Sequence, residues 1–399
     1  MVDFTNIKQA FSDKSNRDLN RAFILFKIIS NPNVSSILTS LVKLALLVRI
    51  PITYFIKISI YKHFCGGETI NDSQKTIDKL WKSSIGTILD YSAEGKKTKK
   101  DFKNALDETL QVIKESENNK KIPFIVFKVT GLIQLDILKK LNNHKKLNNT
   151  EQDKFNVFLN KISIICNAAR GSKTPVLIDA EESWIQDAID NIALDLMREY
   201  NKEHVMIYNT LQFYRLDRIK YLYKLLDISK EENFKLGLKL VRGAYHQQEI
   251  KRAKQKKYPI PVHLKKEMTD RDFNLSLKIC IDNINRVSIC SGTHNEESSA
   301  LLIKLMKEKE IKNNDKRIYS SQLLGMSDNI SYNLSTENYN VSKYVPYGPV
   351  REVIPYLIRR ADENKSISGQ MGRELNNIIK EKARRKKPNH YIQKPHLEC

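Results

Sequence analysis

Residues 176–212, VLIDAEESWIQDAIDNIALDLMREYNKEHVMIYNTLQ, contain the pattern that decides the fold. A short apolar run at 176–180 is followed by an amphipathic stretch at 183–199 and by a second apolar run at 205–212. Runs that are apolar at consecutive positions, rather than at alternate ones, are typical of strands buried on both faces. A strand, a helix and a strand in this order predict a parallel pair of strands joined by a helical crossover.

The same alternation continues on both sides of this stretch. Six further runs are predicted as strands: 85–91, 124–130, 235–243, 287–293, 318–324 and 341–347. Eight strands separated by helical patterns, the last of them at 350–364, indicate an α/β protein with a (β/α)8 barrel. We therefore expect an N-terminal helical arm over residues 1–80 and a barrel over residues 81–399.

Composition excludes several classes of protein. The chain has 399 residues, 41% of them hydrophobic and 29% charged, which argues against a disordered chain and against an integral membrane protein. The net charge of +22 suggests an acidic partner, either nucleic acid or an anionic membrane. The lysines are spread along the chain, and stretches such as KKLNNHKKLNN (139–149) suggest solvated loops, so we expect no nucleic-acid partner.

Signature motifs of metal and nucleotide sites are absent from the sequence. The five cysteines are an odd number without a C-x-x-C spacing, and no H-E-x-x-H occurs. We therefore expect no bound metal and no disulfide framework. There is no G-x-G-x-x-G and no P-loop motif, which argues against a Rossmann or P-loop nucleotide site.

The start of the chain lacks the features of a targeting segment. Asp3, Asp13 and Asp18 are unlike a transit peptide, which avoids acidic residues, and no cationic start with an apolar run indicates a secretory signal. The most apolar stretch, residues 36–61, is interrupted by charged residues and by Pro51, so no uncharged run is long enough for a spanning helix. It predicts either a helical arm packed on the main domain or an interfacial helix pair at a membrane surface.

Polar residues follow the predicted strands where barrel enzymes carry their chemistry, at the C-terminal ends. These residues are Lys128, Asp179, Glu181, Glu182, Gln212, Arg242, Thr293, His294, Asn295 and Tyr344. The alternative is that they lie at solvent-exposed starts of loops, where a charged side chain costs little free energy.

A second group of polar residues lies in PYLIRRADEN (355–364). Tyr356, Arg359, Arg360 and Glu363 share one face of a helix. Two guanidinium groups suit bidentate capture of a carboxylate, whereas the simpler alternative is an exposed ion pair. Arg360 would lie about 15 Å along the last helix, so a catalytic role requires this helix to cross the mouth of the barrel.

These residues lie in motifs that resemble the proline dehydrogenase family. The motifs are LIDAEESWIQDAID (177–190), YNTLQFYRLD (208–217), KLVRGAYHQQE (239–249), GTHNEES (292–298), SSQLLGMSDNIS (320–331) and KYVPYGPVREVIPYLIRRADEN (343–364). The resemblance covers about 260 residues, and HFCGGE (63–68) in the arm is similar to the eukaryotic mitochondrial form. It implies a distorted (β/α)8 barrel with the last helix over the active site.

The resemblance also implies the reaction. It predicts the FAD-dependent oxidation of L-proline to Δ1-pyrroline-5-carboxylate, with electrons passed to a membrane quinone. The expected location is the mitochondrion, at the inner membrane or on its matrix side, with peripheral association with the inner membrane.

Site residues carry over from the family motif by motif. The resemblance implies catalytic roles beside substrate and flavin for Lys128, Asp179 and Arg242, with Arg242 near flavin N5. It implies substrate contacts for Leu324, Tyr344, Tyr356, Arg359, Arg360 and Glu363. It implies cofactor contacts for Gln212, Arg242, Gly243, Ala244, Thr293 and His294.

Three alternatives remain open. The first is the sister enzyme that acts on 4-hydroxyproline, which tends to have a small residue where this chain has Tyr344. The second is a member of the family that has lost activity. The third is a basic protein that binds nucleic acid or membrane without catalysis, which would have no need for Asp179, Arg242, Arg359 and Arg360 together.

Overall fold

The computed structural model of the chain describes residues 2–48, 50–92, 98–366 and 370–386. Eight parallel strands form a single sheet in the order β1-β8-β7-β6-β5-β4-β3-β2. The strands are β1 (Ile85–Tyr91), β2 (Ile125–Lys128), β3 (Val176–Asp179), β4 (Ile207–Gln212), β5 (Leu236–Val241), β6 (Val287–Gly292), β7 (Ile318–Leu323) and β8 (Val341–Tyr347). The (β/α)8 architecture expected from the sequence is confirmed.

The sheet curls into a nearly closed barrel, whose seam lies between β1 and β2. The backbone N–H of Thr87 in β1 donates to the carbonyl of Lys121, just before β2, at 2.7 Å. Every other neighbouring pair of strands forms a parallel ladder. The register aligns Lys128 of β2 with Asp179 of β3, and Leu323 of β7 with Tyr344 of β8. The C-terminal ends of the strands therefore meet at one mouth.

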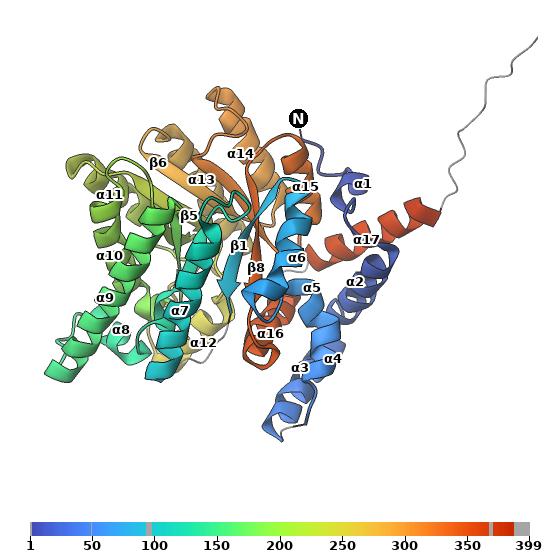
Figure 1. The fold of residues 1–399 in the computed structure, drawn as a ribbon, viewed down its shortest axis with the longest axis horizontal. Coiled ribbons are helices and arrows are strands. Elements are labelled where there is room, and N and C mark those ends of the chain that lie inside the picture. The colour runs from blue at the N-terminus through green and yellow to red at the C-terminus, as the bar shows by residue number, and fades with distance from the viewer. Residues whose placement is uncertain (1, 49, 93–97, 367–369, 387–399) are drawn as a thin grey trace, which may run out of the picture.

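Helices follow the strands, and most of them cover the outside of the barrel (Figure 1). They are α7 (Lys99–Ser116), α8 (Leu135–Asn142), α9 (Asn149–Ser172), α10 (Ser183–Tyr200), α11 (Arg218–Glu231), α12 (His246–Lys256), α13 (Lys266–Asp282), α14 (Glu296–Glu308), α15 (Asp328–Thr336), α16 (Val350–Ser366) and α17 (Gln370–Lys386), with a 3-10 turn η2 (Val129–Gly131) after β2. Their apolar faces pack on the barrel because residues such as Ile189, Leu222 and Leu277 are fully buried.

Helices predominate in residues 2–48 and 50–81. The elements are α1 (Ile7–Ala10), α2 (Asn16–Ile29), α3 (Pro32–Leu47), α4 (Thr53–Ile56), the π-helix η1 (Lys57–Tyr61), α5 (Lys62–Phe64) and α6 (Ile70–Trp81). Helices α2 and α6 begin with capping boxes, at Ser15 with Asp18 and at Thr69 with Asp72, which satisfy the free backbone N–H groups of the first turn. Helix α6 packs on β1, whereas α2 packs on α17 from the other end of the chain (Figure 1).

The apolar stretch at 36–61 is largely exposed rather than packed. Its exposed large side chains are Ile37, Leu38, Leu41, Leu44, Val48, Ile50, Tyr54, Phe55 and Ile58. Within the described residues no single helix meets the length and hydropathy criteria for crossing a membrane, although the bent pair Asn16–Ile29 and Asn33–Val42 meets them together. Within this stretch the packed-arm alternative describes Ile56 and Tyr61, which are buried, but not the exposed side chains of α3 and α4.

Candidate active site

A cavity of about 620 Å³ opens at the mouth of the barrel. Its volume is in the range of small-molecule sites, about 300–1,000 Å³. Each of the eight strands lines it with at least one residue, and Tyr356, Arg359 and Arg360 of α16 line it as well. The last barrel helix therefore crosses the mouth. This arrangement was predicted for the distorted barrel, and a regular barrel lacks it.

The lining of this cavity is strongly cationic. Among the described residues, the charged ones comprise seven cations and three carboxylates: Lys128, Lys239, Arg242, Lys266, Arg359, Arg360 and Arg373 against Asp90, Asp179 and Glu267. His294 adds no charge near neutral pH, because burial and the nearby Lys343, Arg360 and Arg242 lower its pKa to about 3. The cavity therefore suits an anionic ligand.

Asp179 lies at the centre of a network at the floor of the cavity. Its carboxylate accepts from Lys128 Nζ at 2.9 Å, from Tyr344 OH at 3.0 Å and from Lys239 Nζ. Burial alone would raise the pKa of Asp179, but Lys128 and Lys239 outweigh it and hold the pKa well below its ordinary value. Asp179 is therefore ionised at any pH at which the enzyme would work.

Lys128 and Tyr344 keep their protons for related reasons. Burial opposes a charge on Lys128, but Asp179 and Asp90, whose Oδ1 lies 3.4 Å from Nζ, raise its pKa. Burial and the charge of Asp179 raise the pKa of Tyr344, so its hydroxyl remains a donor. At the floor, the charges of Asp179, Lys128 and Tyr344 therefore do not change near neutral pH.

Arg242 lies at the side of the cavity and is fully engaged. Nε lies 2.6 Å from Asp270 Oδ1, Nη1 donates to Thr293 Oγ1 at 2.6 Å and Nη2 donates to Ser298 Oγ at 2.9 Å. The guanidinium also stacks over Phe273, 4.4 Å from the ring centroid. Three partners and a stacking ring fix its orientation, so Arg242 positions Thr293 on the loop after β6.

The loop after β5 is held against β4. Gln212 Nε2 donates to the carbonyl of Glu181 at 2.7 Å, and the backbone N–H of Ala244 donates to Gln212 Oε1 at 3.3 Å. Gly243 has φ +128°, and a Cβ there would lie 2.4 Å from the ring of Tyr214. Only glycine fits such a position. The loop lines the cavity with Gly243, Ala244 and Tyr245.

The predicted site residues are mostly brought together. Twelve of them line the cavity: Lys128, Asp179, Gln212, Arg242, Gly243, Ala244, Thr293, His294, Tyr344, Tyr356, Arg359 and Arg360. Arg360 lies over the ring of Tyr356 at 5.1 Å. Glu363 falls in α16, but its side chain is outside the described part of the structure.

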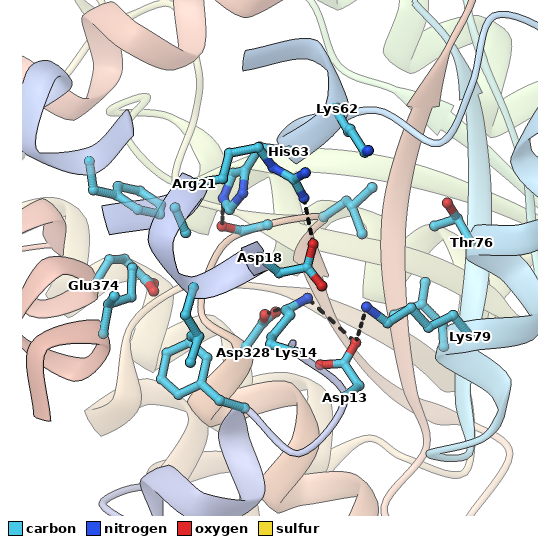
Figure 2. A pocket seen from close by; sticks show the side chains of 18 of the residues that line it. Asp13, Lys14, Asp18, Arg21, Lys62, His63, Thr76, Lys79, Asp328 and Glu374 are labelled. Carbon is cyan, nitrogen blue, oxygen red and sulfur yellow. Dashed lines mark hydrogen bonds and ion pairs between the residues drawn. The ribbon is translucent and has the colours of Figure 1, made fainter. Parts of the chain in front are cut away.

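Leu324 is placed elsewhere. It lines a second, smaller cavity of about 120 Å³ between the helical arm and the barrel, while its neighbour Leu323 lines the large cavity. Figure 2 displays the charged side chains around this second cavity.

Sequence reasoning missed five charged residues of the large cavity. They are Asp90, Lys239, Lys266, Glu267 and Arg373. A lysine in the middle of the otherwise apolar run LGLKLV (236–241) was a signal that could have identified Lys239, because a buried cation needs a partner. No group of three or more histidine, cysteine, aspartate or glutamate residues suited to a metal occurs in the described part of the chain.

Known proteins resemble both the sequence and the fold. The family model described as proline dehydrogenase matches residues 73–373. The carbapenem antibiotics biosynthesis protein CarD of Pectobacterium carotovorum is 33% identical over 81% of this chain and 83% of its own length. Proline dehydrogenase 1, mitochondrial, of Dictyostelium discoideum is 31% identical over 94% of this chain and 74% of its own, and the hydroxyproline dehydrogenase of Xenopus laevis is 28% identical over 94% and 88%.

Among solved structures, proline utilization A from Bdellovibrio bacteriovorus superposes with a TM-score of 0.71 and 17% identity. The match covers 94% of this chain but only 41% of that protein, so it supports the barrel fold alone. The family model spans most of the barrel and all eight strands, including every strand end that lines the cavity. On this evidence the chain belongs to the proline dehydrogenase family of oxidoreductases.

Proposed function

We propose that this enzyme oxidises L-proline to Δ1-pyrroline-5-carboxylate with FAD as its cofactor and a membrane quinone as the final electron acceptor. The observation that carries the proposal is the convergence of Arg359 and Arg360, from the last barrel helix, on a cavity whose floor holds the Asp179 network. Proline loses a hydrogen with two electrons from C5 and a proton from its nitrogen, and FAD supplies the two-electron acceptor for this step.

The donor set of the cavity fits FAD. The excess of cations suits its diphosphate, and Gly243, Ala244 and Tyr245 of the loop after β5 line the same cavity. Gly243, Ala244 and Gln212 would hold the flavin end, and Thr293 and His294 the rest of the molecule. No step of the reaction requires a metal.

Arg359 and Arg360 would bind the proline carboxylate. Two guanidinium groups on adjacent helix positions can offer several parallel N–H donors, which fixes the orientation of a carboxylate as well as its position. Glu363 would support them. Tyr356 and Tyr344 are proposed as walls around the substrate ring, with Leu323 beside them in place of Leu324. Holding C5 in one orientation is the main contribution of these residues to the rate.

The floor network would favour the neutral form of the substrate amine and stabilise negative charge. Lys128 and Lys239 place two positive charges beside Asp179, which makes a third ammonium nearby unfavourable. The amine must be neutral before an imine can form, so this arrangement favours the reactive form. Arg242 is proposed near flavin N5, and Lys239, buried at the floor, is a second cation that can stabilise negative charge there.

Membrane association and mitochondrial location are proposed on two grounds. The Dictyostelium relative is named as mitochondrial, and α3 and α4 expose a row of large apolar side chains. A basic chain is attracted to anionic lipid by about 1 kcal/mol for each lysine or arginine near the surface. The expected result is binding to anionic vesicles that weakens with salt and on deletion of residues 1–70; equal binding by the truncated chain would contradict it.

Hydroxyproline is the alternative substrate, which the similarity to the Xenopus enzyme supports. Tyr344 favours proline, because its ring is buried and its hydroxyl is tied to Asp179 at 3.0 Å, leaving it little freedom to make room for a 4-hydroxyl. A direct comparison of kcat/KM for the two amino acids tests this choice.

An anaerobic visible spectrum of the purified protein, before and after addition of L-proline, tests the main proposal. A flavin band that bleaches with proline, and far less in Arg359→Ala, is the expected result. Arg351→Ala is the matched control, because Arg351 is exposed on the same helix and does not line the cavity. A band that proline leaves unchanged would exclude the substrate, and a colourless protein that takes up no FAD would favour the non-catalytic binder.

A further inference from the structure

Arg373 is a cation of the large cavity that comes from outside the barrel. It lies on α17, the helix after the last barrel helix, and its neighbour Glu374 faces the opposite way, towards the second cavity. Figure 2 displays Glu374 at the edge of that cavity, on the helix that carries both residues. Helix α17 therefore lies between the two cavities and contributes one charged residue to each.

Helix α17 is anchored at both of its ends. Near its start, the backbone N–H of Ser327 donates to Glu374 Oε1 at 2.6 Å, and Ser327 Oγ lies 2.9 Å from His294 Nδ1 in the large cavity. Near its end, Arg385 Nη1 donates to the carbonyl of Lys14 at 2.9 Å. Because Ile378 between them is 1% exposed, the helix cannot shift without breaking a packed contact. The backbone of Arg373 is thus held at a defined place above the loop after β6.

The guanidinium of Arg373 has only a weak attachment to the protein. Nη1 lies 3.2 Å from Glu296 Oε1, and the side chain is 44% exposed. An ion pair this exposed contributes at most about 1 kcal/mol. Glu296 Oε1 also accepts from Asn329 Nδ2 at 2.8 Å, so it keeps a partner if the arginine turns to a ligand.

The other cations of the cavity already have assigned partners. Lys128 and Lys239 bind Asp179, Arg242 is held by Asp270, and Arg359 with Arg360 would take the substrate carboxylate. Two cations remain at the rim, on opposite sides of the loop Thr293–Asn295. Lys266 lies on the β5 side, where it shares Asp270 with Arg242, and Arg373 lies on the β7 side, where its partner Glu296 contacts α15.

We propose that Arg373 is a cofactor-binding residue that pairs with the diphosphate of the dinucleotide, on the side of the β6–α14 loop opposite Lys266. The proposal rests on the proposed function, since it requires FAD as the cofactor. It assigns a role in cofactor retention to a helix outside the eight β/α units. Arginine suits this role because its planar group can donate two parallel hydrogen bonds to phosphate oxygens.

Flavin titration of the purified chain, after removal of bound flavin, tests the assignment. The probes are FAD and riboflavin, which share the ring but not the phosphates, and the readout is quenching of flavin fluorescence. Arg373→Gln is expected to raise the Kd for FAD by about 10- to 100-fold, the range for loss of a charged hydrogen bond. The Kd for riboflavin should change by less than about twofold, because riboflavin has no phosphate for the arginine to bind. Arg384→Gln is the matched control, because Arg384 is an exposed arginine on the same helix, paired with Glu381.

Each other outcome overturns a distinct claim. An unchanged Kd for FAD in Arg373→Gln would overturn the assignment while leaving the proposed function intact. An equal loss of affinity for FAD and riboflavin would mean that the substitution disturbs the packing of α17. It would also overturn the proposed recognition of the diphosphate. Failure of the unsubstituted chain to bind either flavin would overturn the proposed cofactor itself.

Discussion

The two cavities of this protein are lined by similar numbers of charged residues but differ in how those charges are used. In the small cavity, Lys14 lies between Asp13 and Asp328, and Arg21 pairs with Asp18 (Figure 2). Lys343, which does not line this cavity, pairs with Asp328 at 2.8 Å. In the large cavity, cations outnumber carboxylates and α16 and α17 bring three arginines to its edge. Charges that balance within the protein stabilise its fold, whereas an unbalanced set is available to a ligand.

The largest effect is expected when the substrate-binding charges of the large cavity are removed. In Arg359→Gln/Arg360→Gln, kcat/KM for proline should fall by about 10³-fold, since loss of a charged pair costs about 2–5 kcal/mol. The midpoint of thermal unfolding should stay within a few degrees of the unsubstituted protein, because both side chains are only partly buried. Initial rates with an artificial electron acceptor check the first result. A fall of less than tenfold would mean that these arginines do not bind the carboxylate.

The second prediction concerns stability and a substitution that breaks the charge balance at the small cavity. Asp328→Asn removes the carboxylate between Lys14 and Lys343, and the side chain of Lys343 is 0% exposed. Leaving the buried charge of Lys343 without this carboxylate should lower the free energy of unfolding by about 3–5 kcal/mol. Urea unfolding followed by circular dichroism measures it. The matched control, Asp136→Asn, breaks an exposed pair with Lys139 and should cost less than about 1 kcal/mol, so similar losses in the two variants would refute the comparison.

The third effect depends on pH and concerns Glu374, which belongs to the small cavity. Burial raises the pKa of Glu374 to about 7, from an ordinary value of 4.5. The unfolded chain therefore releases this proton first, and stability falls as pH rises from about 4.5 to about 7, with no further loss above. Glu374→Gln should lack this decrease, so its advantage over the unsubstituted protein should grow by about 2–3 kcal/mol between pH 5 and pH 8.

Unfolding measured at several pH values compares the two proteins directly. The nearby Asp328, Lys343 and His63 are present in both, so their own pH dependence cancels in the difference. A difference that stays constant across this range would mean that Glu374 is ionised in the folded protein throughout.

The smallest effect concerns the exposed surface of α3. Leu41 is 55% exposed there, so Leu41→Ser should change the free energy of unfolding by less than about 0.5 kcal/mol. Binding to anionic vesicles, measured by co-sedimentation, should weaken by about three- to tenfold, because part of a leucine side chain would no longer enter the lipid. Val157→Ser on α9, also 55% exposed, should leave vesicle binding unchanged. Equal behaviour of both variants would count against α3 as the lipid contact.

The barrel could be predicted closely from the sequence because its strands are buried on both faces. The predicted bounds of β1 and β8 agree with the structure, and the other six differ by no more than two residues at either end. The differences lie where chain direction changes. The run 124–130, for example, ends as a strand at Lys128 because a 3-10 turn begins at Val129. Apolar runs locate strands, but the exact end depends on the turn that follows.

The site was predictable where residues lie at strand ends and not where they meet through tertiary contacts. Lys128 and Asp179 end neighbouring strands, so their proximity follows from the parallel register. Lys239 lies inside a strand, where a continuous apolar run hides which face is inward. Arg373 depends on the direction that the chain takes after α16, and the pairing of Lys14 with Asp328 joins opposite ends of the sequence. No local pattern contains that information.

The packing of α2 on α17 has a consequence for the order in which the protein is completed during synthesis. Leu19 and Phe26 of α2 are buried beside Ile378 of α17, yet α2 is synthesised first and α17 last. At about 5–20 residues per second, the ribosome needs on the order of tens of seconds to travel from one helix to the other. During that time the apolar face of α2 lacks its final partner. Helix α2 therefore reaches its full set of native contacts only after α17 has been synthesised.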